Sequence, residues 1–124
     1  MRVFKTKEFS RFARKAALDD AALCKAVADA ERGLIDADLG GGVIKQRIAR
    51  RGAGKSGGFR TVILSRRNMR AFFVYGFAKS DRPSVSQDEL AALKELASEM
   101  LAYGDAEITK AKESGPLIEV ACDE

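Results

Sequence analysis

Three strand-forming runs follow one another between Val43 and Phe77, joined by connections too short to contain a helix. The first two runs, residues 43–51 and 59–65, alternate in the period of two that a strand requires. The third run, residues 69–77, is apolar on both sides, which is typical of a strand covered on both faces. Neighbouring strands with such short connections pair antiparallel, so the centre of the chain predicts an antiparallel sheet.

Charge is concentrated in the same part of the chain. Residues 45–82 contain eleven Lys and Arg and one acid, which gives 11 − 1 = +10. Residues 83–124 carry 3 − 10 = −7. A basic segment beside an acidic one predicts a working face for a polyanionic partner, with the acidic tail nearby.

Two Gly-rich connections flank the first strand. Residues 36–42 end in three consecutive glycines and are predicted to be a loop. Residues 52–58 contain four glycines in seven positions, so they predict a flexible hairpin loop longer than a two-residue turn. Gly76, inside the third strand, indicates a bulge or a close backbone approach.

The flanking segments predict helices. Apolar spacing indicates one helix over residues 7–17 and a second from Asp19, with Leu23, Val27, Ala30 and Leu34 on its buried face. A capping box at residues 86–89 starts a third helix that ends at Gly104. A short strand at residues 2–4, a charged helix over 105–114 and a strand over 117–120 complete the prediction.

These elements predict an α+β fold in which an N-terminal helix pair and a C-terminal helix pack on a small antiparallel sheet. We expect one domain over residues 1–104, with residues 105–124 as an acidic C-terminal extension packed on the same domain. The chain has no stretch of eighteen apolar residues and no secretory signal, so we expect no membrane association and a cytoplasmic protein.

The chain lacks residue types that several kinds of active site and metal site require. The chain has no His and no CxxC motif, so we expect no metal site and no cofactor. Cys24 and Cys122 lie far apart, and we expect two free thiols in a reducing compartment. Without His, the commonest general base is missing, and Lys and Arg remain as the groups that handle phosphate.

RNA cleavage by the substrate's own 2′-hydroxyl is the reaction that suits such residues, because the substrate then supplies the nucleophile. Lys45 and Lys55 are candidates for the base, and Arg47, Arg51 and Arg60 for binding the phosphate. The alternative is a basic Gly-rich hairpin that binds nucleic acid, or is merely solvated, without catalysis.

The run from Ile44 to Arg60, with its basic strand and its Gly-Lys-Ser-Gly-Gly-Phe-Arg hairpin, resembles the core of RelE/HigB-type toxins of bacterial type II toxin–antitoxin systems. The segment Tyr75-Gly76-Phe77-Ala78-Lys79 is similar to the family's last strand. This resemblance implies a small RelE-like ribonuclease that cuts mRNA in the ribosomal A site. It also implies a cognate antitoxin, often a helix-turn-helix DNA-binding protein.

The resemblance also assigns site residues. Catalysis is expected from Lys45, Arg47, Lys55, Arg60 and Lys79. The charge of residues 45–82, and not the resemblance, predicts nucleic-acid binding by the other arginines of the basic segment, namely Arg50, Arg51, Arg66, Arg67, Arg70 and Arg82. No residue matches the Tyr or His that some members carry near the last helix, so the general acid is unassigned. A ParE-like inhibitor of DNA gyrase and a non-catalytic RNA-binding module remain the alternatives.

Overall fold

The computed structural model describes residues 1–50, 54–82 and 84–122, without the side chains of residue 50 and residues 54–57. Its elements are β1 (Arg2–Thr6), α1 (Lys7–Lys15), α2 (Asp20–Glu31), β2 (Ala37–Gly40), β3 (Val43–Arg50), β4 (Gly54–Arg66), β5 (Arg70–Ala78), α3 (Gln87–Met100), α4 (Asp105–Ser114) and β6 (Leu117–Val120). The predicted α+β class is therefore confirmed. Within the described ranges, no helix has both the length and the apolarity needed to cross a membrane.

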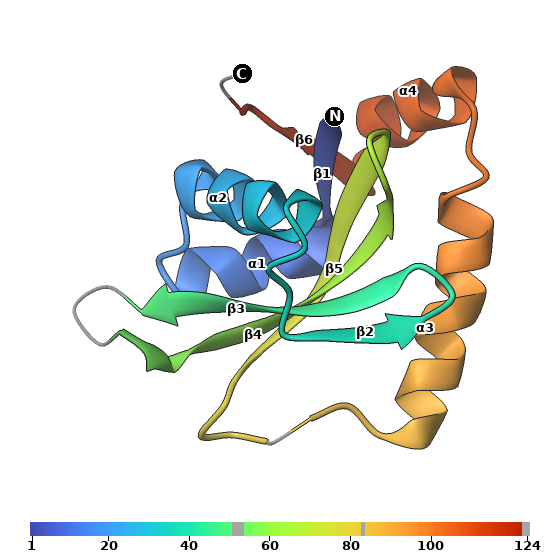
Figure 1. Ribbon diagram of the computed structural model, residues 1–124. Helices are drawn as coiled ribbons and strands as arrows, with labels where there is room; N and C mark the ends of the chain where they lie inside the picture. The colour runs from blue at the N-terminus through green and yellow to red at the C-terminus, as the bar shows by residue number, and fades with distance from the viewer. Residues whose placement is uncertain (51–53, 83, 123–124) are drawn as a thin grey trace.

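The strands form one twisted sheet in the order β2-β3-β4-β5-β1-β6 (Figure 1). The predicted central hairpins are present, because β3 pairs antiparallel with β4, and β4 with β5. β1 lies beside β5 and runs parallel to it, so the sheet is mixed rather than purely antiparallel. The last strand, β6, pairs antiparallel with β1 and forms one edge of the sheet.

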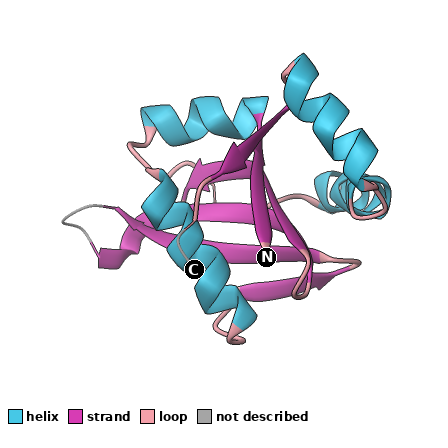
Figure 2. Ribbon diagram, turned by 90° about the horizontal axis from the view of Figure 1, so that it is seen from above, coloured by secondary structure: helices cyan, strands magenta, loops and turns pink. Residues whose placement is uncertain are grey.

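Both faces of the sheet are covered by helices (Figures 1 and 2). On one face, α1 and α2 pack through Phe9, Ala13 and Leu23 against a core that includes Phe73 of β5. On the other face, α3 and α4 join a second core, and this core includes Phe72 of the same strand. Successive residues of β5 are thus buried on opposite sides, as the apolar run predicted.

Three predictions about local structure were wrong in detail. Residues 36–42 are not only a loop, because four of them form the edge strand β2. The hairpin is also shorter than expected, because β4 already begins at Gly54. In both places the ladder of backbone hydrogen bonds to β3 imposes strand geometry on Gly-rich residues with low strand propensity. Leu34, predicted to be buried, is 55% exposed because α2 ends at Glu31.

The prediction of two free thiols was also wrong. Cys24 of α2 and Cys122, which follows β6, form a disulfide across a sequence separation of 98 residues, with Cα atoms 5.6 Å apart. The separation along the chain concealed this contact, because β6 joins the sheet next to β1 and its end lies against α2. The bond therefore ties the C-terminal strand to the N-terminal helix pair.

Of the two features predicted for Gly76, a bulge or a close backbone approach, the structure shows the second at this residue. The bulge of β5 lies two residues away at Val74, since Val62 faces Tyr75 and Ile63 faces Phe73, whereas Gly76 pairs with Thr61. The ring of Phe12 from α1 also lies against its backbone, and a Cβ at residue 76 would stand 2.3 Å from Cε2 of that ring. Phe12 itself is held by the rings of Phe9 and Phe59.

We predict that Gly76→Ala lowers the free energy of unfolding by about 1–3 kcal/mol, the usual cost of overpacking a core. Urea denaturation would measure the loss. Phe12→Leu provides the control, because the smaller side chain leaves room for the new methyl group. If Gly76→Ala costs as much in the Phe12→Leu background as in the natural chain, the steric explanation is incorrect.

Candidate functional site

Three of the predicted catalytic cations meet around one carboxylate on the α3 side of the sheet. Asp36 lies 3.1 Å from Nε of Arg47, 3.4 Å from Nε of Arg60 and 3.7 Å from Nζ of Lys45. We call these four residues the Asp36 cluster. The Arg60 side chain is 5% exposed and the Lys45 side chain 16%, whereas the Arg47 side chain is 44% exposed. Arg47 is therefore the member of the cluster that solvent and a ligand reach most easily.

The sheet register explains why this cluster needs an acid. Arg47 of β3 and Arg60 of β4 are paired directly across the two strands, and like charges in that position repel each other. The Asp36 carboxylate accepts a hydrogen bond from Arg47 and forms an ion pair with Arg60, which offsets the repulsion and part of the cost of burying Arg60. Three cations and one anion leave the cluster with a formal charge of 3 − 1 = +2.

Hydrogen bonds on both sides of the sheet hold Asp36 in place. Its backbone N–H donates to the carbonyl of Lys45. On the opposite face, buried Gln46 donates to the carbonyls of Ala26 and Leu34, at 3.0 and 2.9 Å. These bonds fasten the connection between α2 and β2 to the middle of β3, so the position of Asp36 is set by the fold.

One nitrogen of the cluster is a hydrogen-bond donor without an acceptor among the described residues. Nη1 of Arg60 is buried and has no hydrogen-bond partner among the described residues. An unpaired buried donor is costly, and guanidinium groups bind phosphate oxygens well. The cluster thus combines an exposed arginine with a buried neighbouring arginine that has an unused donor.

We predict that Asp36→Ala lowers the free energy of unfolding by about 3 kcal/mol, because it leaves Arg60 buried without its carboxylate. Thermal or urea unfolding would measure this loss. Asp38→Ala is the matched control, since Asp38 is exposed and accepts a hydrogen bond from the N–H of Gly40. Equal losses in the two variants would contradict the stabilising role assigned to Asp36.

The remaining predicted catalytic lysines lie near this end of the sheet. Lys79 is exposed and follows Ala78, which pairs with the neighbour of Arg60 in β4. Lys55 and Arg50 belong to the paired ends of β4 and β3, and their side chains are outside the described part of the structure. Arg51 lies outside the described residues altogether.

Arg82 makes contacts within the protein, although it was predicted to bind nucleic acid. Its guanidinium donates to the Tyr75 hydroxyl and to the Glu89 carboxylate of α3, and its Nε donates to the carbonyl of Ser84. Hydrogen bonds from Arg82 lower the pKa of Glu89 to about 2. Arg82 therefore joins β5 to the start of α3.

Arg70 is engaged in a similar way. Its side chain is 13% exposed, donates to the carbonyl of Tyr103, and lies 3.1 Å from the Asp105 carboxylate at the start of α4. It links β5 to the connection between α3 and α4. Neither Arg70 nor Arg82 belongs to the Asp36 cluster.

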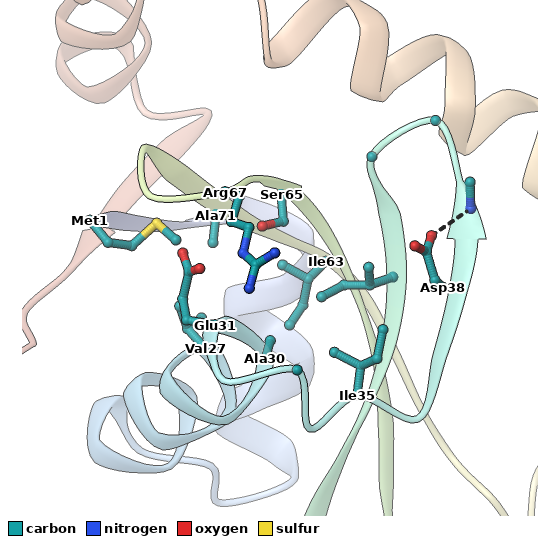
Figure 3. Close-up of a pocket in the computed structure, with 15 residues that line it drawn as sticks. Met1, Val27, Ala30, Glu31, Ile35, Asp38, Ile63, Ser65, Arg67 and Ala71 are labelled. Atoms are coloured by element: carbon teal, nitrogen blue, oxygen red, sulfur yellow. Dashed lines mark hydrogen bonds between the residues drawn. The ribbon is translucent and has the colours of Figure 1, made fainter.

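Arg66 and Arg67 lie at the turn between β4 and β5, where both are exposed. Arg67 lines a separate cleft of about 370 Å³ on the α2 side of the sheet. Figure 3 shows its guanidinium near Glu31, with Ile63 and Ala30 in the same cleft. The predicted nucleic-acid-binding arginines are therefore not gathered in a single place.

Sequence reasoning missed Asp36, although it touches three of the predicted catalytic residues. Asp36 and Asp38 stand two positions apart in the same Gly-rich connection, and nothing in their local pattern separates them. Only the pairing of β2 with β3 shows that Asp36 faces the cations while Asp38 bonds to the backbone of Gly40. The acid is thus identified by the fold rather than by a motif.

Comparison with known proteins bears on the same region. The model of a family described as the RelE toxin of the RelE/RelB toxin–antitoxin system matches residues 1–120. The match includes every residue of the Asp36 cluster and continues through β6. The search of curated proteins finds no significant match.

Proposed function

The chain belongs to the RelE family of toxins, and from this membership and the Asp36 cluster we propose that it is a ribosome-dependent mRNA endonuclease. Such an enzyme arrests translation by cutting the message. The observation that carries the proposal is the grouping of Lys45, Arg47 and Arg60 at one place on the sheet with an excess of positive charge.

The proposed reaction uses the 2′-hydroxyl of the RNA as nucleophile. That oxygen attacks the adjacent phosphorus, and the bond to the 5′-oxygen of the next nucleotide breaks, leaving a cyclic phosphate. The hydroxyl proton leaves to a base, and a proton is delivered to the 5′-oxygen. The protein must therefore hold the phosphate and stabilise the negative charge that grows on it.

In our proposal Arg47 contacts the scissile phosphate directly, because its side chain is the most exposed of the three cations. Arg60, its cross-strand neighbour, contributes positive potential from a buried position, where electrostatic effects are stronger than in water. Lys45 takes part in proton transfer.

Membership of the family implies a cognate antitoxin. We propose that this partner is a helix-turn-helix DNA-binding protein and that the toxin acts in the cytoplasm on translating ribosomes. An adjacent gene for a small helix-turn-helix protein would support the pairing. Co-expression should then restore growth and yield a stable complex of the two chains.

Inducing the protein in bacteria distinguishes the proposed activity from its alternatives. Mapping of mRNA 5′ ends should reveal new cuts in phase with codons, while plasmid supercoiling stays normal. Broken or relaxed DNA with intact mRNA would instead indicate a gyrase inhibitor of the ParE type. Binding to RNA with neither effect would indicate a non-catalytic RNA-binding module.

A further inference from the structure

The disulfide between Cys24 and Cys122 lies at the rim of the core on the α1 and α2 side. Both cysteines are partly exposed, whereas Leu23, next to Cys24 in α2, and Val120 of β6 are buried. Sγ of Cys24 lies 3.5 Å from the carbonyl oxygen of Ala121, which is an exposed residue. A small thiol in solution can therefore reach the bond while the protein stays folded.

The bond fastens the end of β6, a short strand at the edge of the sheet. β6 has four residues and pairs with β1 alone. Its start is held independently of the cysteines, because Leu117 is buried in the core on the α3 side and Glu119 forms an ion pair with Arg2. Its last pairing joins Val120 to Val3, and beyond it the disulfide joins the chain to α2. Breaking the bond therefore frees the end of β6 from α2 while its start remains anchored.

A disulfide is unusual in the compartment where we propose that this protein acts. Disulfides are rare in the cytoplasm, and those that occur there are usually transient and catalytic or redox-sensing. Structural disulfides resist reduction by glutathione, whereas exposed ones are labile and often regulatory. An exposed disulfide at the end of an edge strand therefore has the properties of a redox-sensing bond rather than a permanent one.

We propose that Cys24 and Cys122 form a redox-active clasp, which small thiols such as glutathione open and small disulfides close. This rests on the proposed function in one respect, namely that the protein acts in the reducing cytoplasm. In the open form the end of β6, residues 119–122, separates from β1 and α2. The Asp36 cluster contains none of these residues, so the clasp controls the attachment of the strand and not the chemistry of the cluster.

Opening the clasp takes two thiol–disulfide exchanges. A glutathione thiolate attacks one sulfur of the bond, which forms a mixed disulfide and releases the other cysteine as a thiolate. A second glutathione thiolate attacks the glutathione sulfur of the mixed disulfide, and this step releases the second cysteine thiolate and oxidised glutathione. Two electrons thus pass from glutathione to the protein, and the cysteine thiolates take up the two protons that glutathione lost. Closing is the reverse, with oxidised glutathione as the oxidant.

The first test places the natural protein in two glutathione buffers, one at the redox poise of the bacterial cytoplasm and one with an excess of oxidised glutathione. Free thiols are trapped by alkylation and counted by mass spectrometry, and circular dichroism monitors the fold. We expect most molecules to carry two free thiols in the first buffer and the disulfide in the second, reversibly and with the fold retained in both. A bond that stays closed in the first buffer, or a protein that unfolds when the bond opens, would overturn the proposal.

Hydrogen exchange with short labelling then shows where the protein opens. We expect the amides of residues 119–122 to exchange at least about tenfold faster in the reduced protein, because a short edge strand without its crosslink opens locally. Amides in the interior of β4 should stay unlabelled in both forms over the same time. Cys24→Ala/Cys122→Ala is the control, and its exchange should match that of the reduced protein in either buffer. Equal protection of residues 119–122 in the oxidised and reduced protein would refute the clasp.

Neither measurement involves RNA, so the clasp and the proposed function can fail separately. A clasp that opens and closes in a protein that never cuts mRNA would stand, while the proposed function would be refuted. A bond that stays closed in the cytoplasmic buffer, in a protein that does cut mRNA, would refute the clasp alone.

Discussion

Replacing Arg47 with alanine is expected to slow ribosome-dependent mRNA cleavage by about 100-fold or more, the usual cost of removing one group that stabilises charge in a transition state. The fold should be retained, because the Arg47 side chain is 44% exposed and its pairing with Asp36 is a partly solvated salt bridge. Single-turnover cleavage of a ribosome-bound message would measure the rate, and thermal unfolding would verify the stability.

Arg32→Ala is the matched control for this prediction. Arg32 is also exposed and also lies near an aspartate, Asp29 at 3.8 Å, but it follows α2 and lies outside the Asp36 cluster. Its loss should leave cleavage unchanged. The cleavage rate of Arg47→Lys should lie between those of the natural protein and of Arg47→Ala, because lysine keeps the charge but not the planar pair of donors. Equal activity of Arg47→Ala and Arg32→Ala would remove Arg47 from the reaction.

The second large effect concerns the disulfide between Cys24 and Cys122. Replacing both cysteines with alanine should lower the free energy of unfolding by about 4–5 kcal/mol, because the bond closes a loop of 98 residues and restricts the unfolded chain. For a domain of this size such a loss lowers the melting temperature by roughly 15 °C. Differential scanning calorimetry of the oxidised protein and of the double variant would measure the difference.

Reductant provides an internal control for the disulfide. Dithiothreitol should lower the melting temperature of the natural protein to that of the double variant and should not change the variant. If the natural protein melts at the same temperature with and without reductant, the disulfide does not contribute to stability. A thiol assay on the unfolded protein would show whether the bond was present at the start.

Local pattern was sufficient to predict the centre of the fold. The alternation in β3 and β4 placed Lys45 and Arg47 on one face and Gln46 on the other, and the structure has them there. The apolar run of β5 correctly predicted a strand buried on both sides. These features follow from the alternation of polar and apolar side chains along one strand, which can be read from a single segment of the sequence.

Features that depend on distant parts of the chain were not predictable in this way. β2 is a strand because β3 lies beside it, and its Gly-rich sequence carries no strand signal. Asp36 reaches the cations, and Arg82 reaches Tyr75 and Glu89, through contacts that only the assembled sheet creates. The sequence thus predicted the cations of the candidate site, but it did not predict that Asp36 pairs with them.

The most direct test of the Asp36 cluster as a nuclease site uses purified ribosomes programmed with a short message. One message is all RNA, and a second has a single 2′-deoxynucleotide in place of the nucleotide whose 2′-hydroxyl would attack. We predict that the protein cuts the first message at one codon only when the ribosome is present, leaves the second intact, and loses the cut in Arg47→Ala. Cleavage of the deoxy-substituted message, or no cleavage of either message by the natural protein, would contradict this account.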